Sequence, residues 1–246
     1  TTLSILAATT FFQPLAHAES SFSAEQITEL NVLIKDYIEA NPKMVLNALE
    51  DHRVKELERI EKEAREKAKN LSKEFKKTTD YPTSGNEDGD IVLVEFFDYN
   101  CGYCKRALSA VQDVLKNDKD VKVVWIELPI LGDASLLASK WALAAEKQGK
   151  YFDYHQELMG HRGQKTEKEL AKLAENIGLD ADKLAKDAGS KEIEDKLAAN
   201  RTLAEELGIA GTPAFIIEDE IVRGFVPYQS IVTMIKAARD VKAAAE

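Results

Sequence analysis

The chain is poor in cysteine and in basic residues, and it has no long uninterrupted hydrophobic run. Its 246 residues include two cysteines, and 33 basic side chains stand against 43 acidic ones, for a net charge of −10. Two cysteines exclude a disulfide-rich scaffold. The acidic balance gives no overall basic surface of the kind that neutralises phosphates, which argues against nucleic acid as a partner. The length suffices for one large domain or two smaller ones.

The apolar run at the N-terminus, residues 3–18, is interrupted by Gln13 and Pro14. It is too short and too broken for a transmembrane helix. It ends in Ala16-His17-Ala18, the small-x-small pattern of a signal-peptidase site. We interpret residues 1–18 as most of a secretory signal whose basic n-region is missing; a buried N-terminal helix is the alternative. The signal predicts a location in the periplasm or at the cell surface, where an oxidising environment permits disulfide chemistry.

Glycine is absent before Gly85, and this absence separates a helical first third from a mixed remainder. In residues 19–50 apolar side chains recur at spacings of three and four, and Asn41-Pro42 marks a break between two helices. Two short amphipathic helices cannot bury these side chains against each other alone. We therefore expect the same segment of another subunit to cover them, with a dimer favoured over a trimer. The predicted oligomerisation residues are Ile27, Leu30, Leu33, Ile34, Tyr37, Ile38, Val45, Leu46 and Leu49.

Charged side chains dominate residues 51–80, where pairs such as Glu58 with Lys62 have the i, i+4 spacing that stabilises an exposed helix. This pattern predicts a solvated helix, either a plain connector or an arm that sets the distance between catalytic domains. The turn-forming residues between 78 and 90 predict a linker after it. We therefore assign residues 51–90 to a charged helical linker.

From residue 91 the pattern changes to strands that alternate with helices. The apolar runs 91–97 and 121–128 predict strands buried on both faces. Helical patterns fill residues 132–207, a hairpin is expected over 214–225, and a last helix follows. Residues 91–246 are accordingly predicted to form one α/β domain that carries a helical insertion.

Both cysteines lie where the first of these strands runs into a helix. Cys101 would begin that helix, where unpaired backbone N–H groups and the positive end of the dipole favour a thiolate. Cys104, one turn later, would be the resolving thiol that attacks a mixed disulfide. Gly102 and Tyr103 between them set how strongly the thiolate is favoured. A zinc site needs two more ligands, and a structural disulfide in so short a loop stabilises little. We therefore predict a redox-active dithiol with neither metal nor cofactor.

The motifs over roughly residues 91–244 resemble those of the DsbA-type thioredoxin-fold thiol-disulfide oxidoreductases. The secreted members with N-terminal helical extensions, namely the Com-type surface antigens and the ScsC group, are the most similar. The fold class that this implies is α/β, a thioredoxin fold with an inserted helical domain, preceded by an all-α oligomerisation segment and a helical linker. The motifs that carry the resemblance are Cys101-Gly102-Tyr103-Cys104, Gly211-Thr212-Pro213, Phe96-Phe97-Asp98-Tyr99, Glu127-Leu128-Pro129 and Gln148-Gly149-Lys150-Tyr151.

The resemblance also implies roles for single residues. It places a cis peptide bond between Thr212 and Pro213, facing the cysteines, where the backbone of Thr212 pairs with an extended substrate. Glu95 would be a buried acid with a raised pKa that carries the proton of Cys104, unless its carboxylate simply reaches solvent or a lysine. Tyr99, Tyr103 and Phe97 are expected in an apolar rim that receives unfolded substrate, with core packing favoured for Phe97.

The direction of the reaction is suggested by the residues beside the cysteines. Gly102-Tyr103 and Thr212 resemble the DsbC-type isomerases, whereas the monomeric oxidases usually carry Pro-His and Val at these places. An oligomer that presents several Cys101 thiolates to one misfolded protein also favours an extracytoplasmic isomerase or reductase. A DsbA-like oxidase, or a protein with both activities, is the near alternative, and a non-catalytic surface or copper-binding protein is a third. The expected partners are misfolded or reduced secreted proteins and a membrane redox protein of the DsbB or DsbD type.

Overall fold

A computed structural model describes residues 22–77 and 80–244 of the chain. The predicted signal, residues 1–18, lies outside the described residues. The described chain separates into two units, one ending at Leu57 and one beginning at Glu58, and each is considered by itself.

The first unit consists of helix α1 (Ala24–Ala40) and the beginning of helix α2 (Pro42–Lys77). Ser23 begins α1 with a reciprocal capping box, since its hydroxyl accepts the N–H of Gln26 and the Gln26 side chain accepts the N–H of Ser23. The break at Asn41-Pro42 is where the sequence predicts it. The nine predicted oligomerisation residues all lie on these two helices, and all are exposed except Val45, which is half-buried.

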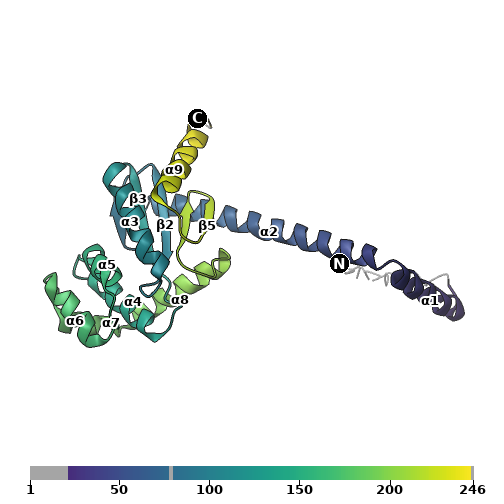
Figure 1. The fold of residues 1–246 in the computed structure, drawn as a ribbon, viewed down its shortest axis with the longest axis horizontal. Coiled ribbons are helices and arrows are strands. Elements are labelled where there is room, and N and C mark those ends of the chain that lie inside the picture. Colours follow the sequence, from purple (N-terminus) through teal and green to yellow (C-terminus); the bar gives the residue numbers. More distant parts are fainter. Residues whose placement is uncertain (1–21, 78–79, 245–246) are drawn as a thin grey trace, which may run out of the picture. The chain divides into compact units, whose positions relative to one another are not determined.

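The second unit is built on a five-stranded sheet with the order β1-β3-β2-β4-β5 (Figure 1). Strands β2 (Ile91–Phe97) and β3 (Val121–Glu127) are parallel and wholly buried, as predicted. Strands β4 (Ala214–Ile217) and β5 (Glu220–Arg223) form the predicted hairpin, and β4 pairs antiparallel with β2. Strand β1 (Thr83–Gly85) pairs antiparallel with β3, inside the segment predicted to be a turn-rich linker. Three residues are too few to show a strand period, which is why the sequence pattern missed it.

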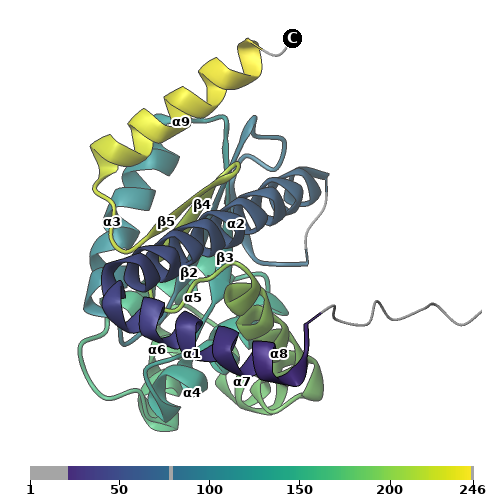
Figure 2. The ribbon, with the colours of Figure 1, turned by 90° about the vertical axis from the view of Figure 1, so that its right-hand side faces the viewer.

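Helices cover both faces of this sheet. Alternate residues of β2 enter two separate cores: Leu93 and Phe97 pack with helices α3 (Gly102–Asn117) and α9 (Tyr228–Ala243), and Val94 packs on the other side. The second half of α2 lies over that other side, as Figure 2 shows, with Ala68 and Phe75 in its core.

The packing of α2 against the sheet differs from the solvated helix that the charge pattern predicts. Ala64, Ala68, Ser72 and Phe75, spaced by three and four residues, form a buried stripe on one face of an otherwise charged helix. Small side chains let the helix approach the strands closely, and they give only a weak apolar signal in the sequence.

Between β3 and β4 lies an insertion of helices, within the predicted range 132–207. The insertion helices are α4 (Asp133–Glu146), α5 (Tyr151–Gly160), α6 (Glu167–Asn176), α7 (Ala181–Ala188) and α8 (Lys191–Glu206). Helix α4 packs against α5, α7 and α8, and α8 also contributes Ala204 to the core under α2. Among the described helices, none combines the length and the apolarity that crossing a lipid bilayer requires.

Candidate active site

Cys101 lies at the junction of β2 and α3. It is the N-cap residue of α3, and its N–H donates to the carbonyl of Asp98 at 3.0 Å, which closes the turn after the strand. Cys104 follows within the first helical turn and is fully buried, whereas Cys101 keeps 7% of its surface exposed. Both are free thiols. Cys101 is therefore the less buried of the two cysteines.

The loop before β4 reaches the same place. Because β4 pairs with β2 through Ala214 and Phe96, the residues just before β4 lie beside the end of β2. The Thr212-Pro213 peptide bond is cis, and the carbonyl of Thr212 accepts a hydrogen bond from the Cys101 thiol at 3.2 Å. The cis bond that the resemblance implies is thus present, and it faces Cys101.

Glu95 lies inside the sheet beneath the cysteines, between Trp125 on β3 and Phe215 on β4. The side chain is buried, and its Oε2 atom has no hydrogen-bond partner in the described part of the chain. Burial raises the pKa of Glu95 well above its usual range, and the charge of Cys101 raises it further. The alternative in which the carboxylate reaches solvent or a lysine is wrong.

The buried thiol of Cys104 interacts electrostatically with this acid. Burial is the largest effect on Cys104 and raises its pKa well above the ordinary value of a thiol, and the charge of Glu95 acts in the same direction. Hydrogen bonds from the Asp98 backbone and the Thr212 side chain act in the opposite direction and do not outweigh burial. A thiol in this position has to give its proton to a neighbouring base before it can attack a disulfide, and Glu95 is an acid with which it interacts.

Tyr99 is not part of a substrate rim, and that prediction is wrong. Its ring is fully buried, and its hydroxyl donates to Glu127 at 2.8 Å and lies 3.1 Å from Nδ1 of His155. Glu127, at the end of β3, also accepts hydrogen bonds from Tyr151 and Ser139, so the carboxylate joins the turn after β2 to α4 and α5. Burial nevertheless raises the pKa of Glu127 to about 8, because these hydrogen bonds offset only part of its cost. Tyr99 therefore belongs to a polar network that joins the insertion to the sheet.

Tyr103, one of the predicted residues close to Cys101, is open to solvent, with 57% of its surface exposed. The Arg106 guanidinium lies 5.2 Å from the centre of its ring, within the range of a cation–π contact. Gly102 beside it has open space where a side chain would begin. The dipeptide between the cysteines thus lies on the surface of α3, where it can touch a bound polypeptide.

Asp98 is a positioning residue that the sequence singled out only as a landmark of the resemblance. Its carboxylate accepts hydrogen bonds from the N–H groups of Asn100, Ile130 and Leu131 and from the Ser135 hydroxyl, at 2.7–2.9 Å. The side chain therefore ties the turn before Cys101 to the loop between β3 and α4. An aspartate directly after a strand, two residues before the N–H it accepts, is a known turn signal, but its contacts with residues 130–135 have no local signature.

Lys165 is a second residue that sequence reasoning missed. It lies in the loop between α5 and α6, is 4% exposed, and donates from Nζ to Oδ1 of Asn100 at 3.0 Å. The Asn100 amide in turn donates to the Ser135 hydroxyl at 2.8 Å. Both the oxygen and the nitrogen of the Asn100 side-chain amide are thus hydrogen-bonded, which fixes the residue before Cys101. The lysine is 65 residues away along the chain, so no sequence pattern connects it with the cysteines.

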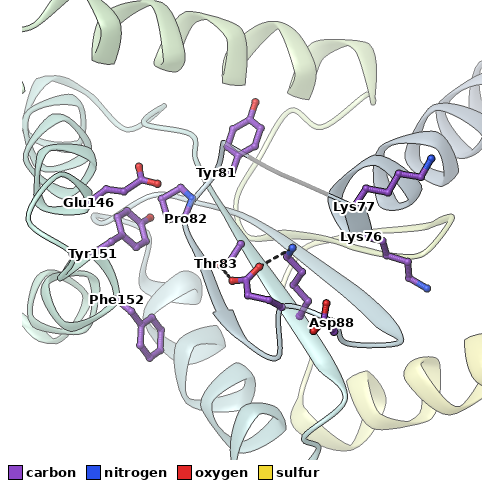
Figure 3. Close-up of a pocket in the computed structure, with 12 residues that line it drawn as sticks. Lys76, Lys77, Tyr81, Pro82, Thr83, Asp88, Glu146, Tyr151 and Phe152 are labelled. Atoms are coloured by element: carbon purple, nitrogen blue, oxygen red, sulfur yellow. Dashed lines mark hydrogen bonds and ion pairs between the residues drawn. The ribbon is translucent and has the colours of Figure 1, made fainter.

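A pocket of about 580 Å³ lies away from this site, at the β1 edge of the sheet (Figure 3). Tyr81, Pro82 and Tyr151 line it, and Lys122 forms an ion pair with Glu87 there at 2.8 Å. Neither cysteine lines it, and of the residues described above it contains Tyr151, which belongs to the network of Glu127. Within residues 22–77 and 80–244, no group of three or more His, Cys, Asp or Glu side chains could hold a metal ion.

The sheet order, the helix that begins at Cys101 and the cis-proline loop define a thioredoxin-type dithiol site. Residues 92–236 match the family model described as a DSBA-like thioredoxin domain. The chain belongs to this family of thiol-disulfide oxidoreductases, which confirms the resemblance found in the sequence.

Solved structures agree with this assignment. A thioredoxin-like oxidoreductase from Silicibacter pomeroyi is 40% identical, covers 68% of this chain and 96% of its own, and has a TM-score of 0.65. The thiol-disulfide exchange protein alpha-DsbA2 from Wolbachia pipientis is 31% identical, with 72% and 97% covered and a TM-score of 0.67. A linker-deletion mutant of Proteus mirabilis ScsC is 26% identical, with 89% and 98% covered and a TM-score of 0.64.

Curated relatives include several Na(+)/H(+) antiporters named NhaA. One from Salinispora tropica is 27% identical over 135 residues. This chain spans about a quarter of the length of these antiporters, so the similarity concerns one part of them.

Proposed function

We propose that this protein rearranges or reduces disulfides in secreted proteins as an oligomer, with Cys101 as the nucleophile. The observation that carries the proposal is the contact between the Cys101 sulfur and the carbonyl of Thr212. A substrate strand that pairs with the backbone of Thr212 would bring its own disulfide to the same sulfur. Because Cys101 is the less buried thiol, attack begins there.

The reaction is a sequence of thiol-disulfide exchanges. The Cys101 thiolate attacks one sulfur of a substrate disulfide, a mixed disulfide forms, and the other substrate sulfur leaves as a thiolate. If another substrate thiolate then attacks the mixed disulfide, Cys101 is released and the substrate disulfide has been rearranged. If Cys104 attacks instead, the substrate leaves reduced and the Cys101–Cys104 disulfide remains. In that branch Glu95 takes the proton from Cys104, since a carboxylate buried beside the thiol is a base of suitable strength.

Two features support isomerisation over simple oxidation. The dipeptide Gly102-Tyr103 and the residue Thr212 are of the isomerase type, and the exposed apolar residues of α1 and early α2 offer a surface for a second copy. Linking two catalytic domains raises the effective concentration of the second thiolate near a bound substrate. The predicted secretory signal supports a location outside the cytoplasm, where a membrane protein of the DsbB or DsbD type would reset the pair.

Reactivation of ribonuclease with scrambled disulfides tests this proposal. The full chain should restore ribonuclease activity, the Cys101→Ser variant should restore none, and Cys104→Ser should retain a part, because substrate thiols can release the mixed disulfide. Retained activity in Cys101→Ser would contradict every exchange mechanism at this site.

A dithiol oxidase is the second candidate, since the family model that the chain matches is the DSBA-like one. The redox state of the pair in cells separates the two functions. An oxidase is found mainly with Cys101 and Cys104 bonded to each other, whereas an isomerase is kept reduced. Trapping thiols with an alkylating agent at the moment of lysis and counting the added mass shows which state dominates.

A further inference from the structure

Two segments that are far apart in the sequence and meet beside Cys101 carry four basic side chains. Lys105 and Arg106 belong to the second turn of α3, and Arg162 and Lys165 to the loop between α5 and α6. Two hydrogen bonds hold the segments together, from Lys105 Nζ to the carbonyl of His161 at 2.5 Å and from Lys165 Nζ to Asn100 at 3.0 Å. We call these four residues the basic cluster.

The basic cluster has no ion-pair partner. In the described part of the chain none of its four side chains forms a salt bridge, although many other lysines and arginines of the second unit do. The one acid that acts on Lys165 is Asp98, whose oxygens are already engaged by N–H groups and the Ser135 hydroxyl. What distinguishes this cluster is that four cations without salt bridges lie on two segments that are hydrogen-bonded to each other beside Cys101, in a chain with a net charge of −10, so that a partner of opposite charge would be attracted there.

The cluster's charges also repel one another. The pKa of Lys105 is lowered, first by burial and then by the charge of Arg162. The pKa of Lys165 is lowered to about 8, first by burial and then by the charge of Lys105. Positive potential thus accumulates at this place, and an incoming anion would relieve it.

An aromatic surface adjoins the cluster. Tyr103 is exposed between the two cysteines, and Arg106 lies against its ring. A polypeptide that lies along Thr212 with its sulfur at Cys101 would therefore meet a ring and several cations beside the reacting bond. Aromatic and arginine side chains are the residues that most often anchor bound polypeptides.

We propose that the basic cluster selects polypeptide substrates that carry aspartate or glutamate next to the reactive cysteine. The inference rests on the proposed exchange at Cys101 and adds the substrate class. In the step concerned, the Cys101 thiolate attacks a substrate disulfide, the bond between the two substrate sulfurs breaks, and the electron pair leaves with the second sulfur as a thiolate. Carboxylates beside that disulfide are drawn to the cluster, which raises the rate of productive encounter.

A competition experiment with trapped adducts tests the proposal. The reduced Cys104→Ser variant is mixed with three peptides in equal amounts, each with one internal disulfide and flanked by Asp and Glu, by Asn and Gln, or by Lys and Arg. Mass spectrometry measures the share of each adduct, and the same peptides reacting with dithiothreitol correct for their intrinsic reactivity. We expect the acidic peptide to exceed the basic one about tenfold at low salt, with the difference shrinking in 1 M salt.

Charge variants identify the source of the preference. Arg106→Gln combined with Arg162→Gln removes two exposed charges while leaving the hydrogen bonds of Lys105 and Lys165 intact, and should bring the acidic and basic adducts close to equal shares. Lys116→Gln combined with Lys236→Gln is the matched control. It removes the same charge from exposed positions without ion pairs, one at the far end of α3 and one on α9, and should keep the preference.

The outcomes separate this proposal from the one on which it rests. If no peptide forms an adduct, exchange at Cys101 fails and the substrate class fails with it. If all three form adducts in equal corrected shares, exchange stands and selection by the basic cluster is overturned. A preference that survives in the Arg106 and Arg162 variant, or disappears equally in the control, also overturns it.

Discussion

Helix α1 leaves large apolar side chains in water, whereas the region around Cys101 takes charged side chains out of water. No residue of α1 is buried, and Leu33 keeps 65% of its surface exposed. Near Cys101 the side chains of Glu95, Asp98 and Lys165 are almost fully buried. Each placement costs free energy unless something compensates for it. At the active site the compensation lies mostly inside the fold, as hydrogen bonds, whereas the proposed compensation for α1 is a second copy of the chain.

The three buried acids near the site differ in how completely they are compensated. The carboxylates of Asp98 and Glu127 each accept three or more hydrogen bonds, but Oε2 of Glu95 has none from the described residues. A carboxylate that accepts several hydrogen bonds fixes the positions of its donors. A carboxylate with an oxygen that accepts none, beside two thiols, is free to take up and release a proton. The difference is consistent with positioning roles for Asp98 and Glu127 and with the proton transfer that we propose for Glu95.

The largest effect on stability is expected for Asp98→Ala. The change leaves three N–H groups and one hydroxyl without their acceptor in a buried turn, which should lower the free energy of unfolding by about 3–5 kcal/mol. Urea denaturation measures the loss, with Asp240→Ala, an exposed acid on α9, as the control. A loss below that of the control would show that the turn before Cys101 does not depend on this carboxylate.

Leu33→Asn should weaken self-association through α1. Burying a leucine contributes about 1.5–3 kcal/mol, so the dissociation constant of the oligomer should rise at least about tenfold. Sedimentation equilibrium measures it, and Lys35→Asn, an exposed change of the same kind on the same helix, is the control. An unchanged constant, or a chain that is monomeric before mutation, would mean that the apolar face of α1 has another partner.

The same two regions show what the sequence can and cannot predict. The path from β2 through Cys101 into α3 is predictable, because apolar runs, the Cys-x-x-Cys spacing and the helix start are local signals. The burial of Tyr99 and the bond from Lys165 to Asn100 are not, because they depend on which helices of the insertion pack over the strand ends. The stripe from Ala64 to Phe75 is visible in the sequence as a weak apolar line, but its packing against the sheet is not predictable, because its mostly small side chains do not indicate which surface covers them.

The smallest predicted effect is a dependence of stability on pH that arises from the buried acids. Burial raises the pKa of Glu127 from 4.5 to about 8, so the folded chain holds a proton that the unfolded chain has released in this range. Stability therefore falls as pH rises through it. His155 makes stability rise with pH below about pH 6.5, because burial lowers its pKa to about 3. Lys165 has the same effect above about pH 8, because burial lowers its pKa to about 8. The fall should be clearest between pH 6.5 and 8, at no more than about 1.4 kcal/mol per pH unit for each acid.

Glu127→Gln isolates the contribution of this one carboxyl, because the amide cannot ionise and still offers an oxygen to Tyr99 and Tyr151. The variant should lose less stability than the original chain between pH 6.5 and 8, as measured by urea denaturation at each pH. Glu175→Gln, an exposed acid of the same insertion, should follow the original chain. Glu95→Gln should also flatten the curve, since its pKa is raised by the same cause. Parallel curves of stability against pH for all four proteins would mean that neither buried acid is protonated in the folded state. The proton-transfer role proposed for Glu95, whose carboxylate lacks the hydrogen bonds of Glu127, would then lose its support.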